Sequence, residues 1–289
     1  MKVLGTGLSG LVGSRIVELL SSKYDFEDIS FDTGVDITDR KRVFEKIKNS
    51  QASIIFHLAA KTNVDACEVD KSLGQDGDAW KINVLGTQNI ADACSQTNKK
   101  LIYISTDFVF DGTKDFYSEN DIPNPVNWYA RTKYEGEKIV QALKTPWIIT
   151  RIAYPYRAEF ERLDFARAIL KRLQEGLTVV AITDHIFTPT FIDDIAFGLD
   201  ALIKNNSQGT FHVVGSQFLT PYDAAILAAK EFGFDQSLIA KTTRSEYFKG
   251  RAERPFQLAI KNDKIKSLGV KMRTLEEGIR EIRIQMSNS

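Results

Sequence analysis

Short apolar runs alternate with amphipathic segments along the first half of the chain. The runs predict strands over 2–5, 29–32, 53–60, 101–105 and 147–152, and the segments between them predict helices over 11–21, 79–96 and 129–143. The run Ile54-Ile55-Phe56 is apolar at successive rather than alternate positions, which is typical of a strand covered on both faces. Strands that alternate with helices in this way indicate βαβ units and a parallel sheet.

The second half of the chain follows a less regular pattern. It predicts helices over 165–173, 192–203, 222–232 and 275–286, and short strands over 179–182 and 211–214. No internal repeat or low-complexity linker separates the two halves. We therefore expect a smaller C-terminal lobe that packs tightly on the sheet domain and exchanges segments with it.

Composition narrows the class of protein. The 289 residues include 38 Lys+Arg and 38 Asp+Glu, and this zero net charge argues against a broad surface for nucleic acid or an anionic membrane. No apolar run approaches the ~18 residues of a membrane span, and the N-terminus lacks the pattern of a signal peptide. Cys67 and Cys94 are too few for a disulfide framework, and no Cys/His spacing is typical of a metal site. We expect a soluble cytoplasmic protein without a metal.

The first candidate for chemistry is a glycine-rich turn between the first predicted strand and the first predicted helix. Glycines in a G-x-x-G-x-x-G pattern allow a tight turn and a close approach of the backbone to a pyrophosphate. The helix N-terminus then faces the phosphates with free N–H groups. The turn therefore predicts a dinucleotide cofactor, NAD(H) or NADP(H). The expected contacts are Gly7, Leu8, Ser9, Gly10, Leu11, Val12 and Gly13.

The position of this turn after a strand and before an amphipathic helix specifies the fold class. We expect an α/β fold, a Rossmann-type doubly wound parallel sheet with a smaller α/β C-terminal substrate lobe. The NAD(P)-binding domain is expected over residues 1–152 and the substrate-binding lobe over 153–289. Segments around 186–215 are expected to return to the first domain.

Two aspartates are candidates for the adenosine end of the cofactor. Asp32, at the end of the predicted second strand, follows the glycines by about 20 residues, where an acidic residue commonly holds the ribose hydroxyls. This favours NAD mildly, since Arg15 or a nearby loop offers a site for a 2′-phosphate. Asp32 is alternatively a turn residue before Gly34. Asp36, with Ile37, is a candidate for the adenine edge or, equally, the start of the next helix.

A tyrosine and a lysine form the second candidate. Tyr129 and Lys133 are four residues apart in a predicted helix and therefore share one face. The pKa of a free tyrosine is near 10, and a neighbouring cation favours the phenolate and lowers that pKa. Such pairs are common on solvated helix faces, so the pair becomes informative only together with the glycine turn. It then predicts an acid–base group beside a cofactor.

The third candidate is the segment that leaves the fourth predicted strand. Ligands of doubly wound sheets bind at the carboxyl ends of the strands. A hydroxyl of Ser105 or Thr106 is therefore expected to reach a substrate oxygen beside Tyr129. The alternative is a strand end whose hydroxyls satisfy their own backbone.

Together these elements resemble the extended short-chain dehydrogenase/reductase superfamily and, within it, the dTDP-4-dehydrorhamnose reductase family. The resemblance covers essentially the whole chain. The further motifs that carry it lie at 57–65, 83–89, 105–112, 188–194, 209–212 and 254–258.

The resemblance implies a function and a set of site residues. It implies hydride transfer from NADH or NADPH to C4 of a nucleotide-linked 4-keto-6-deoxysugar. Tyr129 would protonate the forming alkoxide, Lys133 would hold the nicotinamide ribose, and Thr106 would hydrogen-bond the oxygen. Cofactor contacts are implied for Leu58, Ala59, Ala60, Lys61, Asn83, Ser105, Tyr129 and Lys133. Substrate contacts are implied for Thr62, Val64, Thr106, Asp107, Phe108, Tyr154 and Arg254.

Departures from the family pattern bear on the substrate. Phe108 stands where sugar-nucleotide dehydratases carry a catalytic Glu, which argues against a dehydratase. Tyr154 stands where the family usually has Trp, and the stretch 254–258 is shortened, so we expect a reshaped sugar pocket. Arg254 is a candidate diphosphate clamp or, alternatively, a surface arginine before a turn proline.

Two other functions fit the same motifs. One is a cofactor-binding regulatory subunit of the methionine adenosyltransferase type, which belongs to the same family and works through a partner enzyme. The other is a nucleotide-sugar epimerase, which keeps the Tyr/Lys pair. The expected partners are a nucleotide-sugar substrate and, as a possibility left open, a second copy of the chain in a homodimer.

Overall fold

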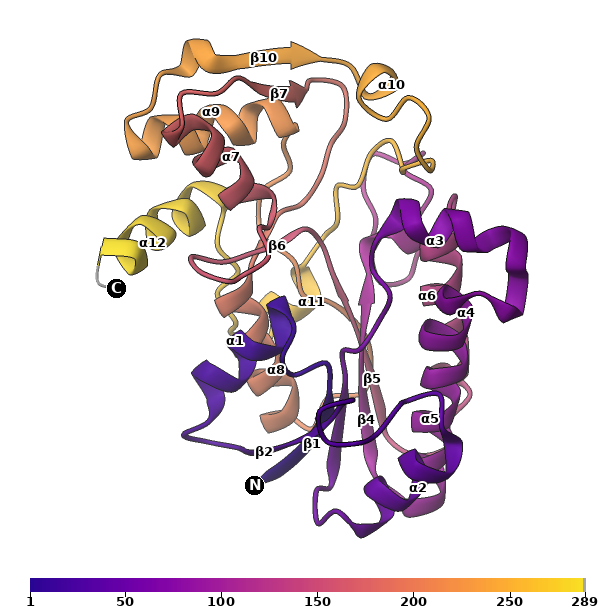
Figure 1. The fold of residues 1–289 in the computed structure, drawn as a ribbon. Helices are drawn as coiled ribbons and strands as arrows, with labels where there is room; N and C mark the ends of the chain where they lie inside the picture. Colours follow the sequence, from indigo (N-terminus) through magenta and orange to yellow (C-terminus); the bar gives the residue numbers. More distant parts are fainter. Residues whose placement is uncertain (288–289) are drawn as a thin grey trace.

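The structure is a computed structural model that describes residues 1–287, and a six-stranded parallel sheet lies at its centre (Figure 1). The strand order is β2-β1-β3-β4-β5-β9, so the order reverses between β1 and β3. The strands are β1 (Lys2–Thr6), β2 (Asp25–Ile29), β3 (Ile54–His57), β4 (Lys100–Thr106), β5 (Trp147–Ile152) and β9 (Gly209–His212). This arrangement confirms the predicted Rossmann-type doubly wound sheet.

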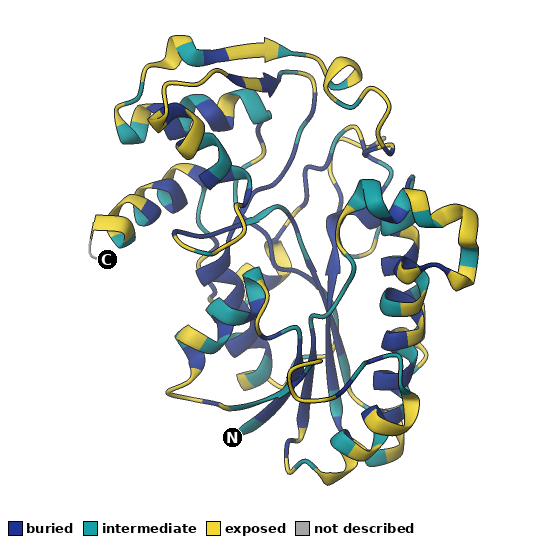
Figure 2. Cartoon of the chain, in the orientation of Figure 1, coloured by how far each residue is buried: buried dark blue, intermediate teal, exposed yellow. Residues whose placement is uncertain are grey.

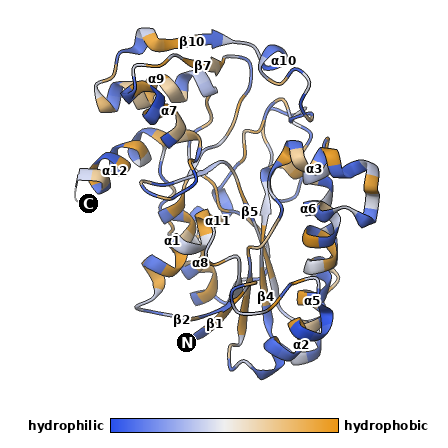
Figure 3. Cartoon of the chain, in the orientation of Figure 1, coloured by the Kyte–Doolittle hydropathy of each residue, from blue (hydrophilic) through white to orange (hydrophobic). Residues whose placement is uncertain are grey.

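Helices cover both faces of the sheet (Figure 1). One layer consists of α2 (Arg40–Asn49), α5 (Thr87–Thr97) and α6 (Trp128–Gln141), and the other of α1 (Leu11–Leu20), α8 (Ile192–Lys204) and α11 (Asp263–Lys266). The central strands are both buried and hydrophobic, as Figures 2 and 3 show. This double burial is why their apolar residues run continuously.

The predicted helix over 79–96 is interrupted. It consists of α4 (Asp78–Trp80), a π-helical segment over Lys81–Gly86, and α5. Gly86 lies against Ile37, because a Cβ at residue 86 would come within 2.7 Å of the Ile37 Cδ1. Short π-helical turns are frequently found at functional sites.

The second strand lies earlier than predicted. We expected 29–32, but β2 ends at Ile29, and residues 31–34 form a turn in which Gly34 has a φ of +76°. β2 is an edge strand, so Asp25, Glu27 and Asp28 have access to solvent, and Glu27 pairs with Lys2 at 3.0 Å. The charged residues of β2 break the apolar pattern that predicts a strand, and an edge strand does not need an apolar run.

The C-terminal part of the chain forms a second set of layers. It contains α7 (Phe165–Gln174), α9 (Pro221–Phe232), α10 (Arg244–Tyr247) and α12 (Leu275–Ser287), with the parallel pairs β7 (Val179–Ile182) with β10 (Ile239–Thr242) and β6 (Pro155–Tyr156) with β8 (Thr190–Phe191). The remaining elements are α3 (Val64–Asp70) and the short turns over Lys71–Asp76, Asp107–Val109 and Gln236–Leu238. β8 leads directly into α8, and β9 pairs with β5 in the central sheet. The domain boundary at residue 152 stays a prediction.

Within residues 1–287, no helix is long and apolar enough to cross a membrane, and no cluster of three or more His, Cys, Asp or Glu is arranged to hold a metal ion. Cys67 and Cys94 are both buried and free of a disulfide.

A buried ion pair joins α6 to β5. The Arg151 guanidinium donates through Nε to the Glu137 Oε1 at 2.9 Å and through Nη2 to Oε2 at 2.6 Å. Glu137 is 0% and Arg151 2% exposed. The bidentate geometry satisfies both charges, which is the condition under which a buried pair is tolerated.

Replacement of Arg151 by Met will therefore leave the Glu137 carboxylate buried without a partner. We expect Arg151→Met to lower the free energy of unfolding by about 3–5 kcal/mol, measured by urea denaturation. The double variant Arg151→Met/Glu137→Leu should recover most of that loss, because it removes both charges. Equal destabilisation of the single and double variants would show that packing, and not the unpaired charge, sets the cost.

Candidate active site

A cavity of about 850 Å³ opens at the carboxyl ends of β1, β3 and β4. This is the place where the strand order reverses, and ligands of doubly wound sheets bind there. The cavity brings together most of the residues expected from the sequence. They are Gly7, Gly10, Leu11, Val12, Gly13, Leu58, Ala59, Ala60, Thr62, Ser105, Thr106, Tyr129, Lys133 and Tyr154.

The glycine turn forms one wall of the cavity, and two of its glycines are sterically required. Gly7 has a φ of +68°, and a Cβ there would lie 2.8 Å from the Ala59 nitrogen. A Cβ on Gly13 would lie 2.3 Å from the Gly7 carbonyl oxygen. Gly10 is the N-cap of α1, and the first residues of that helix, Leu11, Val12 and Gly13, line the cavity. This cradle fits a dinucleotide pyrophosphate.

We expect Gly13→Ala to force the turn open. Overpacking of this kind costs about 1–3 kcal/mol, which urea unfolding of the apo protein will measure. Gly10→Ala is the matched control, since its nearest non-bonded atom would lie at 3.3 Å. A Gly13→Ala protein no less stable than Gly10→Ala would contradict the steric role of Gly13.

The predicted acid–base pair lies on α6, whose N-terminus is fixed by a cap. The Asn127 side chain accepts a hydrogen bond from the Ala130 N–H at 2.9 Å, and its Nδ2 donates to the Glu253 carbonyl at 2.8 Å. The Lys133 Nζ donates to the Ile104 carbonyl at 2.8 Å. Both Tyr129 and Lys133 line the cavity, beside Thr106 at the end of β4.

Burial controls the protonation of this pair. Burial raises the pKa of Tyr129, and its hydrogen bond with Thr106 acts in the opposite direction. The sequence predicted that Lys133 would lower that pKa. The structure gives the opposite direction, because the effect of burial on the phenol outweighs the others, and the Lys133 ammonium instead contacts the Ile104 carbonyl and lies 4.0 Å from the centre of the Tyr103 ring. Burial lowers the pKa of Lys133 itself to about 7, while Glu137 acts to raise it.

The Lys133 shift predicts a pH-dependent stability. The folded pKa of about 7 lies below the ordinary 10.5, so between these values the unfolded chain binds more protons than the folded one. The free energy of unfolding, relative to Lys133→Met, should therefore rise from pH 7 to pH 10. Chemical denaturation of both proteins across that range measures the difference. A difference independent of pH would show that the folded protein holds Lys133 as an ordinary ammonium.

Asn83 and Lys61 support the cavity from behind. Asn83 lies in the π-helical segment and is 1% exposed. Its side chain accepts from the Lys61 N–H at 2.8 Å and donates to the Lys61 carbonyl at 3.1 Å and to the Thr132 Oγ1 at 2.9 Å. The Lys61 ammonium pairs with Asp70 at 2.8 Å. Both residues therefore position the backbone after β3 rather than line the cavity.

The residues expected at the adenosine end lie outside the cavity lining. Asp32 is an exposed turn residue, three positions after the end of β2. The Asp36 Oδ1 accepts from the Thr38 N–H at 2.8 Å, which is a turn contact, and Asp39 rather than Asp36 caps α2. Arg15, the candidate for a 2′-phosphate, is bound instead to Asp193 of α8 at 2.7 Å.

The hydroxyls at the end of β4 differ in their partners. Thr106 Oγ1 accepts from the Phe108 N–H at 3.2 Å. Ser105 Oγ is buried and has no hydrogen-bond partner among the described residues. The alternative of a strand end that satisfies its own backbone therefore applies to Thr106 but not to Ser105.

Aromatic side chains, among them Tyr129, Tyr154 and Phe165, line part of the cavity. Phe108 does not line it but packs against Tyr129 and Tyr154, with ring centres at 6.1 and 5.9 Å. Tyr154 has a φ of +39°, and a residue other than glycine in this region stores backbone strain, which is common at functional sites. Arg254 does not line the cavity. Its Nη1 pairs with Asp65 and donates to the Ala252 carbonyl at 2.6 Å, so its diphosphate role stays a prediction.

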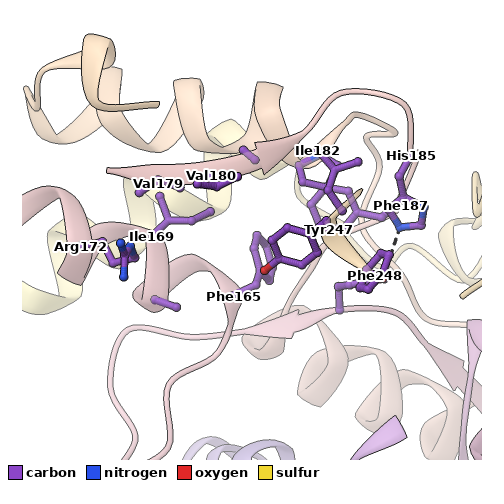
Figure 4. Close-up of a pocket in the computed structure, with 14 residues that line it drawn as sticks. Phe165, Ile169, Arg172, Val179, Val180, Ile182, His185, Phe187, Tyr247 and Phe248 are labelled. Carbon is purple, nitrogen blue, oxygen red and sulfur yellow. Dashed lines mark hydrogen bonds between the residues drawn. The ribbon is translucent and has the colours of Figure 1, made fainter. Parts of the chain in front are cut away.

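A second cavity of about 440 Å³ adjoins the first in the C-terminal lobe (Figure 4). Tyr154 and Phe165 line both cavities. The other walls are largely apolar and come from α7, β7 and α10. Sequence reasoning missed this cavity and the segment Phe160, Arg162, Leu163, Asp164 and Phe165, which lines the first. No motif signals these residues, since only the packing of the lobe brings them to the sheet.

Comparison with known proteins identifies the family of this chain. The family model described as RmlD substrate binding domain matches residues 1–287. The chain belongs to this family. A dTDP-4-dehydrorhamnose reductase of Bacillus anthracis in complex with NADP is similar in structure, with a TM-score of 0.89 and 28% identity over 98% of this chain and 99% of that one.

Two relatives similar in sequence have different names. One is a Haloferax volcanii protein named "Probable low-salt glycan biosynthesis reductase Agl14", which is 30% identical over 98% of this chain and 97% of its own. The other is the mouse methionine adenosyltransferase 2 subunit beta, which is 30% identical over 97% of this chain and 86% of its own. The family therefore contains both reductases and a subunit of another enzyme.

Proposed function

We propose that the protein is an NAD(P)H-dependent reductase of a nucleotide-linked 4-keto-6-deoxysugar. The observation that carries the proposal is the convergence of Tyr129, Lys133 and Thr106 on the same cavity as the glycine turn. A scaffold that only binds a cofactor has no chemical need for a buried proton donor there. The NADP complex of the Bacillus anthracis reductase supports the cofactor class.

In this reaction the residues of the cavity bind the cofactor, donate a proton or hydrogen-bond the substrate oxygen. When bound, the reduced nicotinamide supplies a hydride to the carbonyl carbon of the substrate. The main-chain N–H groups of the glycine turn hold the pyrophosphate, and Lys133 holds the nicotinamide ribose. Tyr129 donates the proton that the new alkoxide needs, and its raised pKa keeps the phenol protonated until then. Thr106 hydrogen-bonds the same oxygen.

The test is oxidation of NADPH or NADH, followed by absorbance, with dTDP-4-keto-6-deoxysugars as substrates. We expect Tyr129→Phe to lower kcat/KM by about 10²–10⁴-fold while cofactor binding persists, because only the proton donor is lost. Product analysis separates reduction from epimerisation, which consumes no net reduced cofactor. Failure of the wild-type protein to reduce any such sugar, despite cofactor binding, would refute the proposal.

A second function is favoured by the mouse relative, which is a methionine adenosyltransferase subunit of similar length. In this alternative the chain binds the cofactor and regulates a partner synthetase. Co-purification of a stoichiometric synthetase from native extract would support it. The homodimer and the cytoplasmic location stay predictions, and light scattering in solution tests the former.

A further inference from the structure

Asp107 is a carboxyl group buried at the active site with one oxygen unsatisfied. It follows β4 directly and is 2% exposed. Its Oδ1 lies 3.1 Å from the Thr106 Oγ1, whereas Oδ2 is buried and has no hydrogen-bond partner among the described residues. An ionised carboxylate in such a place is costly, and protonation removes the cost.

No ion pair among the described residues compensates the charge of an ionised Asp107. The titratable groups that face it are the phenols of Tyr129 on α6 and Tyr154 after β5, whose pKa values its charge raises. Within residues 1–287 it has no ion-pair partner, and Arg254, whose charge acts on Tyr154, is paired with Asp65. Burial raises the pKa of Asp107 to about 7. Its acid form is therefore populated near neutral pH.

Asp111, four residues further along, is a carboxylate of the same segment with hydrogen bonds to both of its oxygens. Its Oδ1 accepts from the Thr113 N–H at 3.1 Å and from the Tyr117 hydroxyl at 2.5 Å, and its Oδ2 accepts from the Asn124 amide at 2.9 Å. These bonds lower its pKa. Asp107 receives the Thr106 hydroxyl and the main-chain N–H groups of residues 107 and 108, and these hydrogen bonds do not offset its burial.

The Thr106 hydroxyl connects Asp107 to the proton donor. It contacts the Asp107 carboxyl at 3.1 Å and lines the cavity beside the Tyr129 phenol, whose pKa it acts to lower. We propose that Asp107 stores the proton that returns to Tyr129 through Thr106 after each reduction. The proposal rests on the proposed function and adds to it a path for the proton, from Asp107 through Thr106 to Tyr129.

The proton and electron balance of one turnover is complete. The hydride forms a C–H bond at the carbonyl carbon while the C=O π pair moves onto the oxygen. The O–H bond of Tyr129 breaks, and its proton goes to this oxygen. The phenolate takes the Thr106 hydroxyl proton, and the Thr106 oxygen takes the carboxyl proton of Asp107. The resulting carboxylate regains a proton from water before the next turnover.

The first test compares the pH dependence of kcat in wild type, Asp107→Asn and Asp111→Asn. Asn keeps the size and the accepting oxygen of Asp but holds no transferable acid proton. We expect the wild-type kcat to fall as the pH rises through about 7, the pKa of Asp107. Asp107→Asn should lower kcat at least tenfold below pH 7 and lose the Asp107 share of that fall. Lys133 titrates in the same range in all three proteins, so only the difference between profiles is assigned to Asp107.

Asp111→Asn should keep the wild-type profile shape, because this carboxylate takes no part in the relay. An Asp107→Asn protein with the wild-type profile and the wild-type kcat would overturn the proposal. An Asp107→Asn protein with a reduced kcat but an unchanged profile would assign Asp107 a structural role and would equally overturn it.

The second test needs no substrate. The folded pKa of Asp107, about 7, lies above the ordinary 3.8, so between these values the folded chain binds more protons than the unfolded one. The free energy of unfolding, wild type minus Asp107→Asn, should therefore fall from pH 4 to pH 7. A difference that stays constant or rises would show an ionised Asp107 and overturn the relay. A wild type that reduces no sugar refutes the proposed function, and this measurement still decides whether Asp107 holds a proton.

Discussion

The depth at which α6 lies against the sheet is the constraint on which the active site depends. Gly136 leaves no room for a side chain, since a Cβ there would lie 2.4 Å from the Tyr103 hydroxyl. The next residue, Glu137, forms the buried pair with Arg151 of β5. Close packing and a bidentate ion pair thus fix the same helix in two directions. The tyrosine and lysine of that helix reach the ends of the strands only because it lies this close.

The same closeness sets the charges of the site. Burial disfavours every ionised form, so it lowers the pKa of Lys133, raises that of Asp107 and keeps the phenol of Tyr129 protonated. The site is therefore poor in fixed charge at neutral pH, in keeping with an uncharged carbonyl as the reacting group. Glu137 is also buried on α6, but it is paired with Arg151, and neither of these two residues lines the cavity.

The two cavities share a wall of aromatic residues. Tyr154 and Phe165 contribute to both, and Tyr154 adopts a strained backbone to do so. The first cavity is built on the sheet with the glycine turn, whereas the second belongs to the C-terminal lobe (Figure 4). A ligand with a reacting group and a separate apolar or planar part would occupy the two together, which agrees with a nucleotide-linked substrate.

The sequence determined the sheet, the glycine turn and the acid–base helix, because strand burial, the turn and the i, i+4 spacing are local patterns. It misplaced β2, since an edge strand carries charges that solvent accepts. It also expected Lys133 to lower the pKa of Tyr129, whereas burial raises that pKa and the ammonium contacts the Ile104 carbonyl. Only the tertiary structure decided the protonation of the buried groups, the engagement of Arg254 by Asp65 and the second cavity. All three depend on which segments, distant in the sequence, pack together and exclude water, and a local sequence pattern does not contain that information.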